Sequence, residues 1–504
     1  MGQEPGLDGP FTILSEVESS TTTVRVLKDE DSFAVFDLHG DIVPAPGSQH
    51  GLYHGGTRFL SGFELRLGAR SPLFLSSTVS DDNAVFTADL TNPDVVKGDQ
   101  VLVARGLLHL SRSRVIQSAT LTERLHVTNY GFQRLNVPLA FRFEADFADV
   151  FEVRGTKRLA RGRLASETAA EEVVLRYRGL DGVERRTCVR SMRRPDGIEP
   201  GALVFHLSVE PHATIGVEIA VTCETGDQKL GFSHFDETVS RWRHRVEAEQ
   251  ARACRPVSSN QDMNRWIQRS TADLHMMMSD TPHGRYPYAG IPWFSTPFGR
   301  DGIITALELL WAVPQVARGV LQFLAQTQAT AAHDARDAQP GKILHEMRTG
   351  EMAALGEVPF GRYYGSADAT PLFVVLAHAY FERTGDRPFI DQLWPHIVSA
   401  LGWIDTHGDR DGDGFVEYAR CSDTGLIQQG WKDSWDSVFH ADGSLARPPI
   451  ALSEVQGYAY AAWSAAAQLA AARGDESQAD QWRQRARTLQ TKFEDAFWCD
   501  ELDT

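Results

Sequence analysis

The 504-residue chain has a formal net charge of −17, with 42% hydrophobic and 23% charged residues. This composition is that of a globular protein with room for two to four domains, and its acidic balance disfavours nucleic acid and anionic membranes as partners. Five scattered cysteines without CxxC spacing argue against a disulfide framework and a zinc site. Because the sequence has no leader-like start and no apolar run of about 18 residues, we expect a cytoplasmic protein.

The first half of the chain, residues 11–225, shows the alternation of apolar and polar residues that is typical of half-buried strands. Runs such as SFAVFDL, FELRLG and LTERLHVTN alternate with period two and are separated by Gly, Asn, Asp and Pro. No helical segment intervenes, so we predict an N-terminal antiparallel β-sandwich, a supersandwich in size, rather than a parallel α/β sheet.

Residues 226–258 form the expected linker, because the apolar residues of 235–253 recur at helical spacing. From residue 259 to 504 the pattern changes to helices separated by long loops rich in Trp, Gly and Pro. Helices are expected at 261–279, 301–312, 314–330, 369–385, 388–408, 453–474 and 477–498. Gly385 and Gly474 stand where C-terminal glycines are expected. This pattern predicts an α-toroid whose loops form a site at one end.

The first loop with chemical potential is GIPWFSTPFGRDG, which contains Trp293, Arg300 and Asp301. Aromatic faces stack on the CH faces of a pyranose ring, and charged planar groups bind neighbouring hydroxyls through paired hydrogen bonds. The alternative is that Asp301 only caps the helix that follows and pairs with Arg300. Both interpretations stay open from the sequence.

Three further loops carry weaker signals. His345, Glu346 and Arg348 lie in GKILHEMRTGEM, where the absence of HExxH favours a supporting or substrate-contact role over a metal. Tyr364 and Asp368 precede an apolar helix, and Asp368 has the competing role of a helix N-cap. The segment DRDGDGFVEY opens like a calcium loop, but its twelfth position is an arginine instead of glutamate, so an acidic turn is preferred and no metal is expected.

The strongest signal is GLIQQGWKDSWDS, in which Trp431 and Trp435 flank Asp433, and Asp436 follows the second indole directly. Packing against apolar indoles disfavours an ionised carboxylate, and a general acid needs a raised pKa of this kind to keep its proton near neutral pH. The alternative is an exposed acidic turn. Glu454, at the start of the following helix, could face the same cavity.

The ordered blocks FGRDG, YYGSADATPLF, DRDGDGF, QQGWKDSWDS and ALSEVQGYAYAA resemble the bacterial amylo-α-1,6-glucosidases and glycogen-debranching-like proteins. These belong to the six-hairpin glycosidases, whose catalytic domain is an (α/α)6 barrel. The N-terminal half also resembles the β-sandwich of that family, in GLYHGGTRFLSGFEL and FEADFADVFEVRG. The resemblance implies a multidomain β + α fold: a sandwich at 11–225, a helical linker at 226–258 and a partial (α/α)6 toroid at 259–504.

The resemblance also implies roles for individual residues. Arg300 and Asp301 match the pair that holds the hydroxyls of the terminal sugar, and Asp433 matches the general acid, with Asp436 in reserve because the loop alignment shifts by one residue among relatives. Trp293, Tyr364, Trp431 and Glu454 are the further expected sugar contacts. About seven helices precede Thr504 where the family toroid has twelve, so the general base is expected beyond Thr504, and a further segment or a second copy of the chain is expected to cover the open half of the barrel.

The expected activity is inverting hydrolysis of a terminal α-glucosidic bond in glycogen or a small α-glucoside, without metal or organic cofactor. Three alternatives from other classes stay open: a carbohydrate-binding or inactive glycosidase-like protein, an α-rhamnosidase, and a disaccharide phosphorylase. Phosphate dependence would identify the phosphorylase, and binding without product release would identify the inactive protein.

Overall fold

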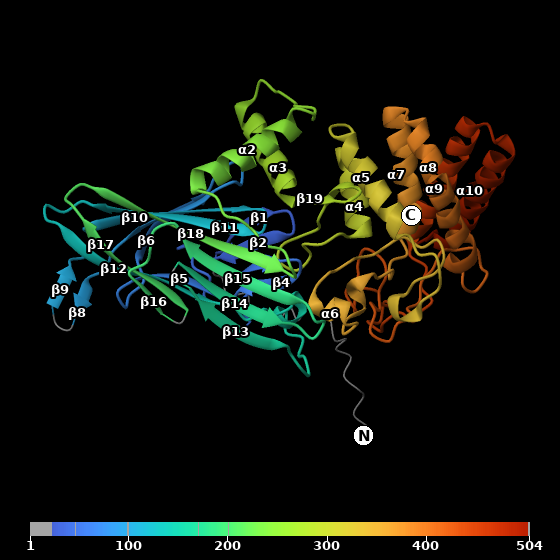
Figure 1. Cartoon of the computed structure of the whole chain (residues 1–504). Helices are drawn as coiled ribbons and strands as arrows, with labels where there is room; N and C mark the ends of the chain where they lie inside the picture. Colours follow the sequence, from blue (N-terminus) through green and yellow to red (C-terminus); the bar gives the residue numbers. More distant parts are fainter. Residues whose placement is uncertain (1–22, 46, 98–99, 170, 200, 502–504) are drawn as a thin grey trace.

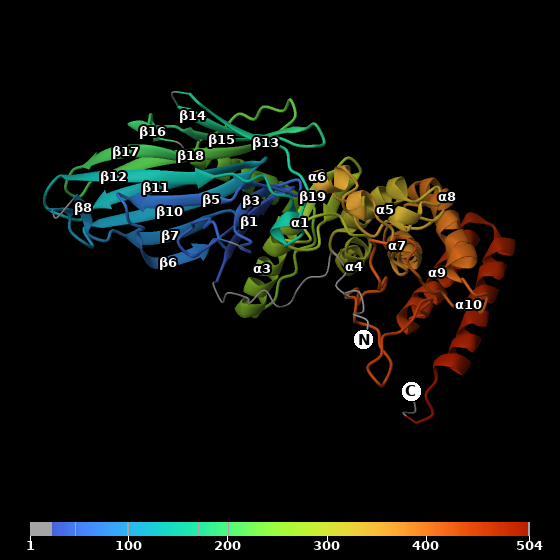
Figure 2. The ribbon, with the colours of Figure 1, turned by 90° about the horizontal axis from the view of Figure 1, so that it is seen from below.

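The computed structural model describes residues 23–45, 47–97, 100–169, 171–199 and 201–501, so the expected start of the sandwich at residue 11 lies outside the described residues. Figure 1 shows a region of strands beside a region of upright helices, and Figure 2 shows the same two regions from below. The predicted fold class, an antiparallel β domain followed by a helical domain, is confirmed.

The described strands form three main sheets and two hairpins, and every pairing among them is antiparallel. In chain order the strands are β1 (Arg25–Asp29), β2 (Ser32–Phe36), β3 (Gly51–His54), β4 (Thr57–Leu60), β5 (Gly62–Leu67), β6 (Leu73–Val79), β7 (Phe86–Thr91), β8 (Val95–Lys97), β9 (Gln100–Val103), β10 (Leu108–Gln117), β11 (Thr120–Asn129), β12 (Leu135–Glu144), β13 (Arg163–Thr168), β14 (Glu172–Arg178), β15 (Glu184–Ser191), β16 (Gly197–Glu199), β17 (Ala202–Val209), β18 (Thr214–Thr225), β19 (Met278–Thr281) and β20 (Gly284–Pro287).

Two of these sheets form the layers of the sandwich. The eight-stranded sheet has the order β13-β14-β15-β18-β11-β10-β7-β6, and the four-stranded sheet has the order β16-β17-β12-β5. Leu125 on β11, Phe141 on β12 and Phe205 on β17 belong to one buried core, so the apolar faces of the two sheets pack on each other. The alternation read from the sequence is therefore the alternation between this core and the outer faces.

The described helices are α1 (Val150–Val153), α2 (Phe235–Gln250), α3 (Gln261–Met277), α4 (Gly299–Leu309), α5 (Pro314–Thr327), α6 (Glu351–Ala354), α7 (Ala369–Thr384), α8 (Arg387–Trp403), α9 (Ser453–Arg473) and α10 (Glu476–Phe497). All seven predicted helices are present. Gly385 and Gly474 end α7 and α9 with positive φ angles of 67° and 87°, as predicted. Asp386 and Asp475 then cap α8 and α10 by accepting backbone N–H groups.

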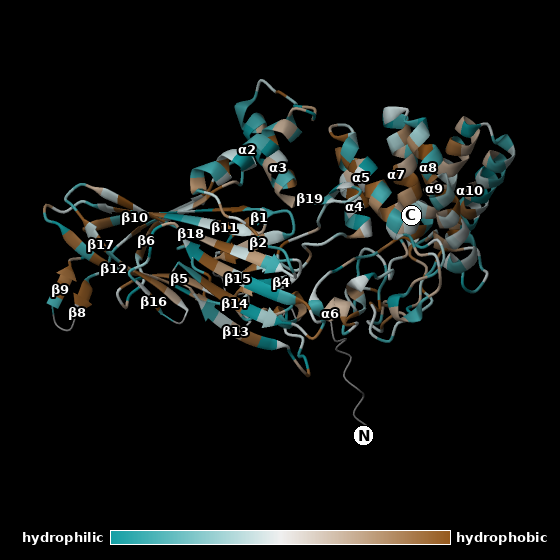
Figure 3. Cartoon of the chain, viewed as in Figure 1, coloured by the Kyte–Doolittle hydropathy of each residue, from teal (hydrophilic) through white to brown (hydrophobic). Residues whose placement is uncertain are grey.

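The helical domain is built around α7, which contacts α4, α5, α8 and α9. Figure 3 shows long apolar stretches on α7, whereas α10 is largely polar because it lies at the edge of the helix array. The loops that connect the helices gather at one end of the array, on the side of α6 (Figure 1). This end is where α4, α7 and α9 begin.

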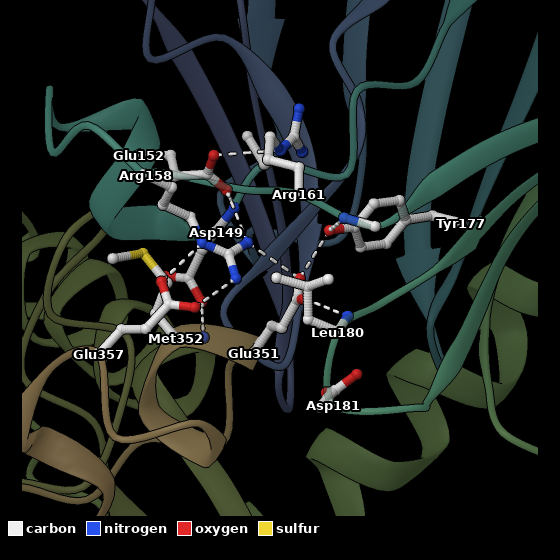
Figure 4. Close-up of polar contacts among 12 residues, drawn as sticks. Asp149, Glu152, Arg158, Arg161, Tyr177, Leu180, Asp181, Glu351, Met352 and Glu357 are labelled. Carbon is white, nitrogen blue, oxygen red and sulfur yellow. Dashed lines mark hydrogen bonds and ion pairs between the residues drawn. The ribbon is translucent and has the colours of Figure 1, made fainter.

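A network of buried polar contacts joins the two domains at α6 (Figure 4). Glu351, the first residue of α6, accepts hydrogen bonds from the Tyr177 hydroxyl (2.8 Å), the Leu180 backbone N–H (2.6 Å) and Arg158 Nη1 (3.1 Å). Arg158, whose side chain is only 1% exposed, also donates two hydrogen bonds of 2.7 Å to Glu357. The β domain therefore holds α6, and with it the end of the loop that carries the second sequence motif.

Candidate functional site

Arg300 is the centre of the site, because its guanidinium joins three loops. It is the second residue of α4, and its Nη1 donates to Asp368 Oδ2 at 2.8 Å and to the Gly430 carbonyl at 3.0 Å. Its Nη2 lies 3.4 Å from Asp433 Oδ2. The structure thus brings the FGRDG, YYGSAD and QQGWKD motifs to one point, although they are up to 133 residues apart.

Asp433 is half-exposed, with 45% of its side chain accessible, and it approaches Arg300 from the loop between α8 and α9. Burial raises the pKa of Asp433, and Arg300 opposes that rise. The net direction is the one that a proton donor requires. The indoles contribute less than the sequence suggested, because Trp431 is 56% exposed and Lys432 Nζ lies 5.2 Å from its ring centroid.

Asp301 does not have the structural role that its position allowed. The N-cap of α4 is Phe298, and Asp301 lies in the first turn without bonding to Arg300, whose partners are the two other carboxylates. Within the described part of the chain, no hydrogen bond links the Asp301 side chain to another residue. Burial raises the pKa of Asp301, and the charge of Asp368 adds to the effect. This carboxyl group is therefore available to a ligand.

Asp368 anchors Arg300 instead of capping a helix. It is 1% exposed, and its carboxylate accepts hydrogen bonds from Arg300 and from the Ser366 hydroxyl. The Ser366 hydroxyl in turn accepts the backbone N–H of Ala369, the first residue of α7. The cap of α7 is thus provided by Ser366, which leaves Asp368 free to neutralise the arginine.

The first two turns of α9 also face Arg300. A Cβ atom on Gly430 would lie 3.8 Å from Glu454 Oε1, which places the Glu454 carboxylate beside the carbonyl that Arg300 binds. Burial raises the pKa of Tyr458, and the charges of Asp368 and Glu454 add to this rise. Glu454 makes no hydrogen bond to another described residue, so it remains a candidate for contact with substrate.

Glu346 and Arg348 form a second buried ion pair, in addition to the pair of Arg300 and Asp368. Arg348 Nε donates to Glu346 Oε2 at 2.9 Å, and both side chains are less than 8% exposed. Burial raises the pKa of Glu346, Arg348 opposes the rise, and the charge of Asp433 adds slightly to it. His345 lies buried between the rings of Phe298 and Tyr363. These three residues support the site.

The structure locates the remaining residues that the sequence proposed for the site. The structure does not support a sugar contact for Tyr364, because it is 5% exposed in the core and its hydroxyl donates to the Thr327 carbonyl at 2.6 Å. Trp293 packs partly buried at the domain junction, against the cluster that contains Phe151. Asp436 is exposed, and its side chain bonds to no other described residue.

A buried network that the sequence did not reveal fixes the loop carrying Asp433. Asp337, in the left-handed conformation with φ of 50°, accepts hydrogen bonds from the Tyr363 hydroxyl at 2.7 Å and Gln429 Nε2 at 3.3 Å. Lys342 donates to the Asp337 carbonyl and to Gln429 Oε1 at 3.3 and 3.5 Å, and burial lowers its pKa to about 8. The only signal in the sequence was a lysine that precedes the apolar pair Ile343 and Leu344.

The acidic turn of DRDGDGF brings carboxylate oxygens of Asp409, Asp411 and Asp413 within 4.8 Å of one another. These carboxylates accept backbone N–H groups of their own turn, including those of Gly412 and Phe415. This is the tight turn that the sequence favoured, and nothing in the described residues adds a fourth ligand.

Two family models match separate parts of the chain. Residues 27–220 match the family described as the N-terminal domain of (some) glycogen debranching enzymes, and residues 299–504 match the mannosylglycerate hydrolase MGH1-like glycoside hydrolase domain. The two models together cover most of the chain, and its fold is that of the (α/α)6 six-hairpin glycosidases. This confirms the resemblance that the sequence blocks indicated, and it identifies the helical region as a glycosidase-type domain.

Two solved structures share the overall fold of this chain. One is described as a kojibiose phosphorylase from the human microbiome, with 11% identity, a TM-score of 0.58, and coverage of 94% of this chain and 66% of that chain. The other is a bacterial glucoamylase in complex with acarbose, with 11% identity, a TM-score of 0.52, and coverage of 93% and 70%. The chain thus spans about two thirds of the length of these proteins.

No curated protein sequence matches the chain. Among the described helices, none is both long and apolar enough to cross a membrane.

Proposed function

We propose that the loop end of the helical domain is the active site of a glycosidase that cleaves a terminal α-glucosidic bond with inversion, in glycogen or a small α-glucoside, in the cytoplasm. The observation that carries this proposal is the arrangement around Arg300. One carboxyl group, Asp433, has a raised pKa and access to solvent, and another, Asp301, has no bonding partner among the described residues. An acid and a hydroxyl-binding group side by side are what a glycosidase needs.

In the proposed reaction, Asp301 and Arg300 bind hydroxyls of the terminal sugar. Asp433 is protonated and gives its proton to the glycosidic oxygen as the bond from that oxygen to the anomeric carbon breaks. Water attacks the anomeric carbon from the opposite face and loses its proton to a second carboxylate. In inverting enzymes the two carboxyl groups are about 6.5–9.5 Å apart, which leaves room for that water.

The contacts of the acidic residues identify the candidates for the general base. Asp368 and Glu346 are each held by an arginine, so neither carboxylate is free to take a proton from water. Glu454 has no such partner and is the internal candidate. The alternative, implied by the family, is a base in a segment beyond Thr504. The variant Glu454→Gln separates these cases, because it abolishes turnover only if Glu454 is the base.

We also propose that a further segment or a second copy of the chain covers part of the helical domain. Trp266 on α3 is 63% exposed, and Trp311, just after α4, is 56% exposed. We infer that these side chains belong to a surface that another element covers, since contiguous exposed apolar patches mark such surfaces. Light scattering of the purified chain, with and without a C-terminal extension, distinguishes the two coverings.

The activity is tested with α-glucosides and α-rhamnosides, using proton NMR to identify the anomer first released. We expect β-glucose from an α-glucoside, and a loss of at least about 10²-fold in turnover for Asp433→Asn with sugar binding preserved. The control Asp436→Asn should keep activity; if it loses activity in place of Asp433→Asn, the acid is misassigned. Release of the α-anomer would refute inversion. Turnover that requires phosphate identifies a phosphorylase, and binding without turnover in any form identifies a binding protein.

A further inference from the structure

The β domain supplies a cation to the neighbourhood of the site. Arg154 follows α1 directly as its C-cap residue, and its guanidinium carbon lies 5.8 Å from the ring centroid of Phe151, 5.9 Å from that of Trp293 and 5.6 Å from that of Phe294. Three aromatic rings from two domains therefore surround one guanidinium. Cations over aromatic faces are stabilised by the ring quadrupole, and more strongly when water is displaced.

Arg154 is also unpaired. No hydrogen bond or ion pair joins its side chain to any residue in the described ranges. The neighbouring Arg348 differs in this respect, because it bonds to Glu346. Burial and, to a smaller extent, the charge of Arg348 lower the pKa of Arg154 to about 10, against an opposing effect of Glu346. A desolvated guanidinium without a carboxylate is costly, which is why buried charges in proteins are normally paired.

The position of Arg154 is fixed by the domain junction. Asp149 caps α1, and its carboxylate accepts the backbone N–H of Phe151 at 3.1 Å and that of Met352, across the junction, at 3.1 Å (Figure 4). A Cβ on Gly350 would lie 2.5 Å from Asp149 Oδ2, so the Asp149 side chain packs closely against the backbone of Gly350. The unpaired arginine is therefore held on a rigid support and not on a free loop.

The loop that contacts Arg154 also carries the proposed sugar-binding pair. Trp293 and Phe294 face Arg154 at one end of this loop, and Arg300 lies at its other end. The charges of Arg154 and of Asp433 both act on the pKa of Glu346, which couples the two ends of the site electrostatically. A substrate whose terminal sugar sits at Arg300 would extend along the loop toward Arg154 with the group on the far side of the bond that is cleaved.

We propose that Arg154 is a specificity residue that binds an oxyanion, either a carboxylate on the group beyond the scissile bond or inorganic phosphate. Its guanidinium offers five N–H donors in a planar fork that matches carboxylate and phosphate oxygens. The oxyanion completes the pairing that the protein leaves open, and Trp293 packs beside it. Binding of a substrate carboxylate rests on the proposed function, whereas binding of inorganic phosphate at Arg154 does not depend on that function.

The test uses a matched pair of disaccharides, maltobionate and maltitol. Both carry an α-glucosyl group on a six-carbon open chain, and they differ in having a carboxylate or an alcohol at its end. In calorimetry we expect the purified chain to bind maltobionate about 10-fold more tightly than maltitol or better. The variant Arg154→Gln should remove this preference without changing maltitol affinity, and Arg154→Lys should restore it only in part.

The control is Arg161→Gln, since Arg161 belongs to the same segment but pairs with Glu152 and should not affect the preference. Phosphate binding is followed separately through tryptophan fluorescence, and we expect its effect to disappear in Arg154→Gln. Phosphate binding that depends on Arg154, with no binding of either disaccharide, would support the oxyanion site and refute the sugar site. Equal affinities for the two disaccharides in the unmodified chain, together with no phosphate response, would overturn the inference, as would a preference that survives Arg154→Gln.

Discussion

The variant Asp368→Asn tests whether Arg300 is the centre of the site. Asp368 is 1% exposed and Arg300 is 15% exposed in their side chains, so their 2.8 Å ion pair is shielded from water. Removing one partner of a buried pair typically costs 3–5 kcal/mol, because the other charge is left uncompensated. Asparagine keeps an oxygen for Ser366, and Arg300 keeps the Gly430 carbonyl, so we expect a loss near the lower limit, about 3 kcal/mol.

The same variant should also lower the pKa of the proposed general acid, Asp433. Without the charge of Asp368, Arg300 has Asp433 as its nearest bonded carboxylate, and a closer approach lowers the pKa of Asp433. An acid must be protonated to act, so activity is present below its pKa and is lost as pH rises through it. The alkaline side of the pH profile of kcat should therefore move to lower pH in Asp368→Asn.

Urea unfolding followed by tryptophan fluorescence measures the first effect, and a pH series of initial rates measures the second. The control is Asp405→Asn, which removes an ion pair with Arg485 that is half-exposed on the arginine side and should cost at most about 1 kcal/mol. A loss below about 1 kcal/mol in Asp368→Asn, with an unchanged pH profile, would show that Arg300 neither needs Asp368 nor influences Asp433.

Three further variants have simpler expectations. Asp301→Ala should weaken monosaccharide binding in calorimetry by about 1.5–3 kcal/mol, through the loss of charge-assisted hydrogen bonds, and unchanged affinity would return Asp301 to a purely helical role. Tyr364→Phe should leave sugar affinity unchanged and cost about 1 kcal/mol of stability in urea, because only the bond to Thr327 is lost; a change in sugar affinity would contradict its placement in the core. Burial raises the pKa of Asp149 from 3.8 to about 6. Between these two pH values the folded state holds a proton that the unfolded chain has lost. The resulting contribution to the free energy of unfolding is complete below pH 3.8 and is lost as the pH rises to about 6. Asp149→Asn should remove this fall of about 3 kcal/mol between the two pH values, and the same fall in the variant would show that another group titrates.

The fold could be predicted from the sequence because its signals are local. The period-two runs of the first half and the helical spacing of the second half report which faces are buried, and both patterns extend over many residues. Gly385 and Gly474 could be assigned because a left-handed residue after a helix strongly favours glycine. The order of strands in the eight-stranded sheet, in which β18 lies between β15 and β11, has no such local signal, because it depends on which strands pair when the chain folds.

Individual site residues were harder to predict. Tyr364 and Trp293 both belong to aromatic motifs beside the site, yet one lies in the core and the other at the domain junction. Nothing in the local sequence distinguishes an aromatic ring that faces a cavity from one that faces the core. Arg154 was missed for a related reason, since it comes from the β domain and approaches the site only through the junction between the domains.

The arrangement around Arg300 shows why the carboxyl groups of the site were ambiguous in the sequence. Asp301 lies in the first turn of α4, Asp368 immediately precedes α7, and Glu454 lies in the first turn of α9. Acidic residues are common at all three positions in any protein, because the positive end of a helix dipole stabilises a negative charge. Here the same dipoles point at one place, where three helices begin around a guanidinium. A capping residue serves its own helix, whereas Asp301 and Asp368 both act on Arg300, and Glu454 lies close to Gly430, whose carbonyl Arg300 binds. That convergence is a property of the tertiary structure alone.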